Sequence, residues 1–192
     1  ITSRSPSVSF AAAMRVTSEP DYGAAMLYGF AGSVRLADIG AAISGDGAVV
    51  GRDGLMLLGV AMLAVGLLFK VGAAPFHLWT PDVYQGAPTP VTGFMAACTK
   101  VAAFGALLRV AYVALPGARW DWMPALWGVA ILTMVVGSVI AIVQTDIKRM
   151  LGYSSVAQAG NFMIGLAAIS VAGEEFTLGA SAILLFVAAY AF

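Results

Sequence analysis

Long apolar runs alternate with short polar links along this chain. A helix needs about 20 mostly apolar residues to cross the apolar core of a bilayer, and most of these runs reach that length. The pattern predicts an all-α fold, a polytopic bundle of transmembrane helices, preceded by an atypical polar stretch at 1–21. The expected spans are 22–34, which is short, and 54–79, 91–113, 124–143, 150–173 and 177–192.

The links between the runs orient the predicted bundle. The link 79–90 contains three prolines, and the link 144–150 contains Lys148 and Arg149. Because cytoplasmic links carry an excess of basic residues, we expect 144–150 to lie in the cytoplasm. Two crossings separate it from 79–90, which places both links on the same side and 115–124 on the opposite side.

The run 54–79 combines a helix break with a charged residue. Pro75 lacks a backbone N–H and clashes with the preceding turn, so the helix is expected to break between Lys70 and Pro75. Broken backbone at membrane depth persists only where it is buried in protein or lines a wet cavity. Lys70, the break and His77 together indicate a proton-handling site. Alternatively, Lys70 snorkels from a helix end and His77 simply lies at the interface.

Lys100 lies near the middle of the run 91–113, where its side chain reaches neither membrane surface easily. A lysine at that depth costs roughly 2.5–3.5 kcal/mol on insertion scales. A buried lysine can exchange its proton near neutral pH, as a proton relay requires. The alternative is a lysine locked in an ion pair with an acidic residue elsewhere in the protein.

A polar face is expected at the start of the run 150–173. Ser154, Gln158 and Asn161 recur at helical spacing, so they share one face of a helix. These side chains could hold a file of water molecules. Hydrogen bonding between helices is the more common role of such residues in membranes, and we favour it.

Composition narrows the possible chemistry. Of the 192 residues, 60% are hydrophobic and 10% charged, whereas soluble domains carry about 25% charged residues. The net charge is zero, so no nucleic-acid partner is expected. One cysteine, Cys98, and one histidine cannot supply an iron–sulfur or bis-histidine haem site. We therefore expect no cofactor and no metal in this chain, and any redox chemistry in another subunit.

Two stretches resemble a known family. These are FKVGAAPFHLWTPDVYQGAPTPVTGFMAACTKVAAFGALLR (69–109) and QTDIKRMLGYSSVAQAG (144–160). Both are similar to the subunit N family of bacterial NADH–quinone oxidoreductase (respiratory complex I), one of the antiporter-like membrane subunits. The first stretch is long and specific, whereas the second occurs in looser form in the sister subunits.

The resemblance implies a fold, an activity and partners. The fold would be part of a longer antiporter-like bundle with inverted repeats and helices broken in mid-membrane. The activity would be proton translocation across the bacterial plasma membrane, coupled to NADH oxidation and quinone reduction in other subunits, which would hold FMN, iron–sulfur clusters and quinone. The partners would be other membrane-arm subunits and the lipid bilayer. The family's proton-carrying residues correspond to Lys70, His77 and Lys100.

The beginning of the chain departs from the family pattern. The family has a glutamate in a Ser-x-Glu-Ala-Ala-x-Lys-Tyr-like motif, and SFAAAMRV (9–16) has Ala11 in its place. Lys70 thus lacks the acidic partner that the family supplies. Because the chain starts with Ile1 and stops at Phe192 inside an apolar run, we expect a fragment of a longer protein, with the domain at 22–192 a partial proton-translocating domain.

These residues lead to one mechanistic hypothesis. Lys70 and Lys100 exchange protons through water, and His77 connects this path to the cytoplasm. A change of charge near Lys70 alters the proton affinity of Lys100 through like-charge repulsion. Two alternatives remain at this point: a subunit of a multi-subunit sodium–proton antiporter, which would use the same lysines, or a truncated copy without function.

Overall fold

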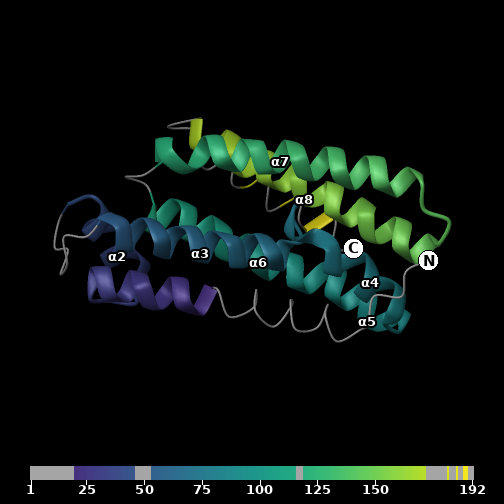
Figure 1. The fold of residues 1–192 in the computed structure, drawn as a ribbon, viewed down its shortest axis with the longest axis horizontal. Helices are drawn as coiled ribbons and strands as arrows, with labels where there is room; N and C mark the ends of the chain where they lie inside the picture. Colours follow the sequence, from purple (N-terminus) through teal and green to yellow (C-terminus); the bar gives the residue numbers. More distant parts are fainter. Residues whose placement is uncertain are drawn as a thin grey trace. The chain divides into compact units, whose positions relative to one another are not determined.

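The computed structural model describes residues 20–45, 53–115 and 119–171 and four isolated positions beyond them. Every element in this part of the chain is helical (Figure 1), which confirms the predicted all-α fold. Helix also covers 20–31. The remaining elements are α2 (Leu36–Ile43), α3 (Asp53–Val71), η1 (Phe76–Leu78), α4 (Trp79–Gly86), α5 (Thr89–Phe94), η2 (Met95–Thr99), α6 (Lys100–Arg109), η3 (Val110–Ala114), α7 (Arg119–Ile142) and α8 (Ile147–Val171).

Within the described residues, three stretches are long and apolar enough to cross a membrane. They are Gly54–Gly86, Thr89–Ala114 and Trp122–Ile142, close to three of the spans predicted from the sequence. The fourth long helix, α8, has 25 residues, enough to cross a bilayer. Of the predicted polar stretch at 1–21, residues 1–19 lie outside the described residues. Nearly all of the predicted span 177–192 also lies outside them.

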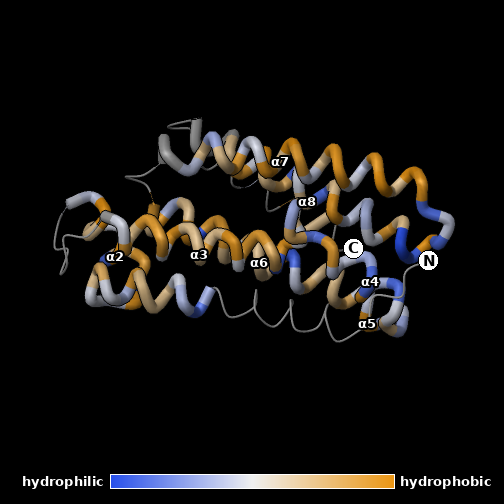
Figure 2. The backbone as a smooth tube through the Cα atoms, viewed as in Figure 1, coloured by the Kyte–Doolittle hydropathy of each residue, from blue (hydrophilic) through white to orange (hydrophobic). Residues whose placement is uncertain are grey.

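The surface of the helices suits an apolar solvent. Figure 2 shows hydrophobic residues along most of α7, with hydrophilic residues gathered near its junction with α8. Several large apolar side chains of α7 are exposed, namely Ile131, Leu132, Val135, Val139 and Ile142. A soluble protein rarely exposes so continuous an apolar strip, whereas lipid tails or neighbouring membrane helices would cover it.

One compact unit of the chain comprises 1–69 and 109–118. In it the helix at 20–31 crosses α3 closely, since a Cβ atom on Gly23 would lie 2.5 Å from the backbone nitrogen of Leu63. The short helix α2, which the sequence did not predict, lies against η3, where a Cβ atom on Gly40 would lie 2.6 Å from the carbonyl oxygen of Val113. Small residues at such crossings let membrane helices pack backbone to backbone.

The second unit comprises 70–108 and 119–192 and contains the candidate site residues. Here α7 and α8 run side by side (Figure 1). A Cβ atom on Gly137 of α7 would lie 2.6 Å from the backbone nitrogen of Ala157 on α8. Helix α4 packs on the start of α8, where a Cβ atom on Gly152 would lie 3.0 Å from Cα of Pro81. Thus α8 lies between α7 and α4 and contacts both.

The predicted helix break is present. Helix α3 ends at Val71, and Gly72 has a φ of +78°, a conformation that glycine adopts without steric cost. The backbone N–H of Ala74 donates to the hydroxyl oxygen of Thr133 on α7 at 3.0 Å. A side chain from α7 therefore satisfies a backbone donor that the break leaves outside any helix, as an apolar environment requires.

Candidate functional site

Lys100 is the first residue of α6 and follows the π-helical turn η2. Its exposed fraction is 3%, in agreement with the position predicted for it inside a span. The ammonium donates a hydrogen bond to the backbone carbonyl oxygen of Ser155 on α8. π-Helical turns are rare and often occur at functional sites, and this one was not predicted from the sequence.

His77 lies in η1, immediately after the helix break. Its exposed fraction is 5%, and its ring meets the ring of Tyr153 on α8 edge to face, with centroids 6.2 Å apart. Neither ring nitrogen has a hydrogen-bond partner among the described residues. A buried polar atom without a partner costs about 1–3 kcal/mol, so such atoms commonly mark a bound water or a functional group.

Thr80, which the sequence did not single out, shares this property. Its exposed fraction is 1%, and its hydroxyl also lacks a partner among the described residues. A Cβ atom on Gly72 would lie 2.8 Å from this hydroxyl, so the absence of a side chain at the break leaves the hydroxyl room. Just beyond the break, the ring nitrogens of His77 can bind a proton, and the hydroxyl of Thr80, three positions later, can form a hydrogen bond.

The structure brings two of the three predicted site residues to one part of α8. His77 contacts Tyr153, and Lys100 contacts Ser155, two positions further along the same helix. Lys70 is placed differently. It lies in the last turn of α3, its side chain is exposed, and among the described residues no hydrogen bond or ion pair joins it to His77 or Lys100.

The predicted polar face of α8 makes its hydrogen bond within the helix. The side-chain amide of Asn161 donates to the amide oxygen of Gln158 at 2.9 Å, and Ser154 is exposed. Within the described residues this bond joins two amides of the same helix, and the hydrogen bonding between helices that we favoured from the sequence stays a prediction. The water file stays a prediction.

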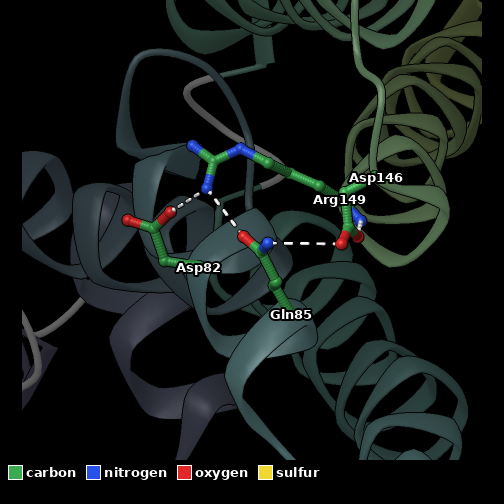
Figure 3. A network of polar contacts seen from close by, with 4 residues as sticks. All are labelled: Asp82, Gln85, Asp146 and Arg149. Atoms are coloured by element: carbon green, nitrogen blue, oxygen red, sulfur yellow. Dashed lines mark hydrogen bonds and ion pairs between the residues drawn. The ribbon is translucent and has the colours of Figure 1, made fainter. Parts of the chain in front are cut away.

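A polar network joins α4 to the start of α8 (Figure 3). One terminal nitrogen of Arg149 donates to the carboxylate of Asp82 at 2.7 Å and to the amide oxygen of Gln85 at 3.1 Å. The amide nitrogen of Gln85 donates to Asp146 at 3.3 Å, and Asp146 accepts the backbone N–H of Arg149 at 3.0 Å. Asp146 thereby caps α8, and the network closes into a ring.

Lys148 strengthens the same junction. Its ammonium donates to the carbonyl oxygen of Ala87, just after α4, at 3.3 Å. The links 79–90 and 144–150 therefore lie together, which agrees with their predicted placement on one side of the membrane. From the sequence, Lys148 and Arg149 were expected to set the topology, and their contacts with α4 and Ala87 were not expected because these partners lie more than 60 positions away.

The described residues contain no group of three histidine, cysteine, aspartate or glutamate side chains that could hold a metal ion. What they do contain is a transmembrane bundle with an interrupted helix, a buried lysine and a buried histidine. Ionisable residues inside a membrane bundle and discontinuous helices are typical of membrane proteins that move ions. The fold defines the class of this chain as a membrane protein with several spanning helices, one of them interrupted.

Comparison with known families identifies the particular group. The family described as "NADH:quinone oxidoreductase/Mrp antiporter, TM" matches residues 21–192, and the chain belongs to this family. Relatives from bacteria and the membrane-spanning helices make it a multi-pass protein of the bacterial plasma membrane.

The curated relatives confirm the resemblance to subunit N. The chain is 64% identical over 152 residues to NADH-quinone oxidoreductase subunit N of Beutenbergia cavernae, which covers 79% of this chain and 28% of the relative. It is 60% identical over 171 residues to the subunit N of Mycobacteroides abscessus, which covers 89% of this chain and 30% of the relative. The chain thus spans less than a third of the length of these relatives.

Two solved structures have the same fold. A chain of respiratory complex I from Thermus thermophilus superposes with a TM-score of 0.72 at 40% identity, over 95% of this chain and 36% of that chain. A chain of the Mrp complex from Dietzia sp. superposes with a TM-score of 0.75 at 21% identity, over 93% of this chain and 32% of that chain. The second likeness concerns the fold alone.

Proposed function

We propose that this chain is part of a membrane-arm subunit of a bacterial NADH–quinone oxidoreductase and carries protons across the plasma membrane. NADH oxidation and quinone reduction in other subunits drive the transfer. The proposal draws on the similarity to subunit N at 60–64% identity. The observation that carries it is the burial of Lys100 in the middle of a membrane span, with an exposed fraction of 3%.

One contact of Lys100 is compatible with proton transfer. Its ammonium donates to a neutral backbone carbonyl of α8, which accepts a hydrogen bond without fixing the charge of the lysine as a carboxylate would. In a buried site of low polarity, electrostatic interactions act more strongly on an ionisable group than they do in water. The lysine side chain also has flexible bonds that can swing the amine between proton donors and acceptors.

His77 and Lys70 complete the proposed path. His77 binds protons near neutral pH in its unperturbed state and contacts the same region of α8 as Lys100. Since η1 leads directly into α4, His77 is assigned the connection toward the cytoplasmic links. Lys70, in the last turn of α3, is assigned the electrostatic control: a shift of charge near Lys70 alters how firmly Lys100 holds a proton.

The rest of the complex supplies the redox chemistry. By the similarity to subunit N, FMN, iron–sulfur clusters and quinone are assigned to other subunits, and the single cysteine of this chain could not hold an iron–sulfur cluster by itself. The partners are then other membrane-arm subunits and the lipid bilayer. A role in an Mrp-type sodium–proton antiporter is less well supported, because the Mrp likeness has 21% identity and concerns only the fold.

The test is made in the full-length protein within the assembled complex. In inverted membrane vesicles, Lys100→Met and Lys100→Arg should lower NADH-driven acidification by roughly tenfold or more, since proton-transfer groups contribute about 10²–10⁴-fold. Lys100→Arg keeps a positive charge but cannot release a proton. Electron transfer from NADH to ferricyanide should persist, because it needs no membrane arm.

Arg109→Met is the matched control, since it removes an exposed positive charge from the same helix, α6. It should pump as the unmodified protein does. Full acidification in both Lys100 variants would remove Lys100 from proton transfer and overturn the proposal. Acidification that requires sodium but not NADH would instead indicate the antiporter.

A further inference from the structure

The ion pair between Arg149 and Asp82 lies at the junction of α4 and α8, outside the proton path proposed above. We propose that Arg149 and Asp82 are positioning residues: they hold α4 against α8 so that His77 keeps its place beside Tyr153. This inference rests on the proposed proton transfer and adds to it the residues that set the geometry of its histidine.

The position of α4 is not fixed by α3. The helix break at 72–75 interrupts the backbone hydrogen bonding between the two helices, and a continuous helix would otherwise transmit orientation from one to the other. The orientation of α4 therefore depends on its side contacts. Helix α4 contacts η1 and α5, which adjoin it in the chain, and α8, which does not. The contacts to α8 include the close approach of Gly152 to Pro81.

The ion pair acts at the outer end of this contact. Arg149 lies in the first turn of α8, and Tyr153 follows four positions later, so the two side chains share one face of the helix. On the other side, Asp82 lies in the first turn of α4, and His77 precedes α4 by two positions. The contacts Arg149–Asp82, Gly152–Pro81 and Tyr153–His77 thus follow one another along the junction.

The network restricts Arg149 in direction as well as distance. Its terminal nitrogen is shared between Asp82 and Gln85, and Gln85 in turn bonds to the cap residue Asp146 (Figure 3). Residues Asp82 and Gln85 are three positions apart on α4, on one face of the helix. Because Arg149 bonds to the first turn of α4 through Asp82 and to its last turn through Gln85, the two bonds together resist rotation of α4 more than a single contact would.

Stability alone does not account for the arrangement. The side chains of Arg149 and Asp82 are 35% and 61% exposed, and an ion pair so accessible to water contributes little to folding. Loss of the pair should therefore leave the protein assembled. Loss of the pair should instead reduce the proton transfer that depends on the position of His77 beside Tyr153.

The test uses charge reversal in the full-length protein within the assembled complex. Asp82→Arg and Arg149→Asp, each alone, should lower the number of protons pumped per NADH oxidised by about two- to fivefold, the range that corresponds to the strength of an exposed pair. The double variant, with both charges exchanged, should restore the ratio. Thr145→Asp is the control, because it adds a negative charge at an exposed position in the same link.

Three results separate the outcomes. The positioning role would be overturned if both single variants pumped as many protons per NADH as the unmodified complex. It would also be overturned if the double variant did not recover pumping although the complex was fully assembled on native gels. Lys100→Met is measured beside them: if it pumps normally, the proposed function itself fails. If it is inactive and the single reversals pump normally, only the positioning role fails.

Discussion

Phe104 and Phe162 pack ring against ring, with centroids 4.7 Å apart and planes inclined by 58°. Phe104 follows Lys100 by one turn of α6, and Phe162 follows Ser155 by two turns of α8. The aromatic pair therefore lies on the same helix-to-helix contact as the hydrogen bond from Lys100 to Ser155. It keeps α6 against α8 and so holds the carbonyl within reach of the amine.

Removal of this ring should weaken the bundle. Phe162 is 1% exposed, and Phe→Ala in a packed core costs about 3–5 kcal/mol. We expect Phe162→Ala to lower the apparent Tm of the detergent-solubilised protein, as measured by heat-induced aggregation. Phe162→Leu, which keeps most of the volume, should lower it much less. Equal effects from both variants would contradict a contribution from ring packing.

The close contact of α7 with α8 should tolerate no side chain at Gly137. A Cβ atom there would lie 2.6 Å from the backbone nitrogen of Ala157, and backbone cannot yield as a side chain does. Gly137→Ala should therefore lower the apparent Tm, since overpacking costs about 1–3 kcal/mol.

Gly128 of the same helix provides the comparison. No atom lies within 4 Å of a Cβ atom built there, and alanine is favoured over glycine inside a helix by about 0.5–1 kcal/mol. Gly128→Ala should leave the Tm unchanged or raise it slightly. If the two substitutions behave alike, the close approach of α7 and α8 is wrong.

The unpartnered hydroxyl of Thr80 leads to an unusual expectation. Replacement of a buried, unsatisfied polar group by an apolar group of the same shape is neutral or stabilising. Thr80→Val should hold or raise the apparent Tm, whereas Thr80→Ser keeps the hydroxyl, loses a methyl group and should lower the Tm. A loss of stability in Thr80→Val as large as that in Thr80→Ser would mean that the hydroxyl is hydrogen-bonded in the full-length protein.

His77 can be tested by a ring of similar shape that binds no proton. His77→Phe should preserve assembly, because the site is buried and already borders the ring of Tyr153. It should lower NADH-driven acidification by roughly tenfold or more, the effect of a missing proton-transfer group. Leu78→Ala, at an adjacent position exposed by 61%, serves as the control. Normal pumping in an assembled His77→Phe complex would exclude His77 from the path.

The features that were predictable from the sequence rest on local chemistry. Pro75 cannot continue a helix, so the break was expected, and α3 does end at Val71. Lys100 lies at the centre of an apolar run, so its place inside a span was expected, and the stretch Thr89–Ala114 contains it. These predictions needed only the chain immediately around each residue.

The features that were missed depend on contacts between distant segments. The carbonyl of Ser155 is a backbone group, and no sequence signal marks which carbonyl an amine will reach. Asp82 and Arg149 are separated by 67 positions, and either one alone reads as an ordinary surface charge. The exposure of Lys70 on the surface of the protein also could not be predicted. An apolar run predicts that a helix lies in the membrane, but it does not show which side of the helix faces protein.

The interruption of α3 also has an electrical consequence. A helix concentrates partial negative charge on the free carbonyls of its last turn, and an unbroken helix would deliver that charge to the membrane surface. Because α3 stops at Val71, inside the stretch Gly54–Gly86, the negative pole also lies inside this stretch, next to Lys70. The peptide backbone itself thus provides a fixed partial negative charge beside the cation of Lys70.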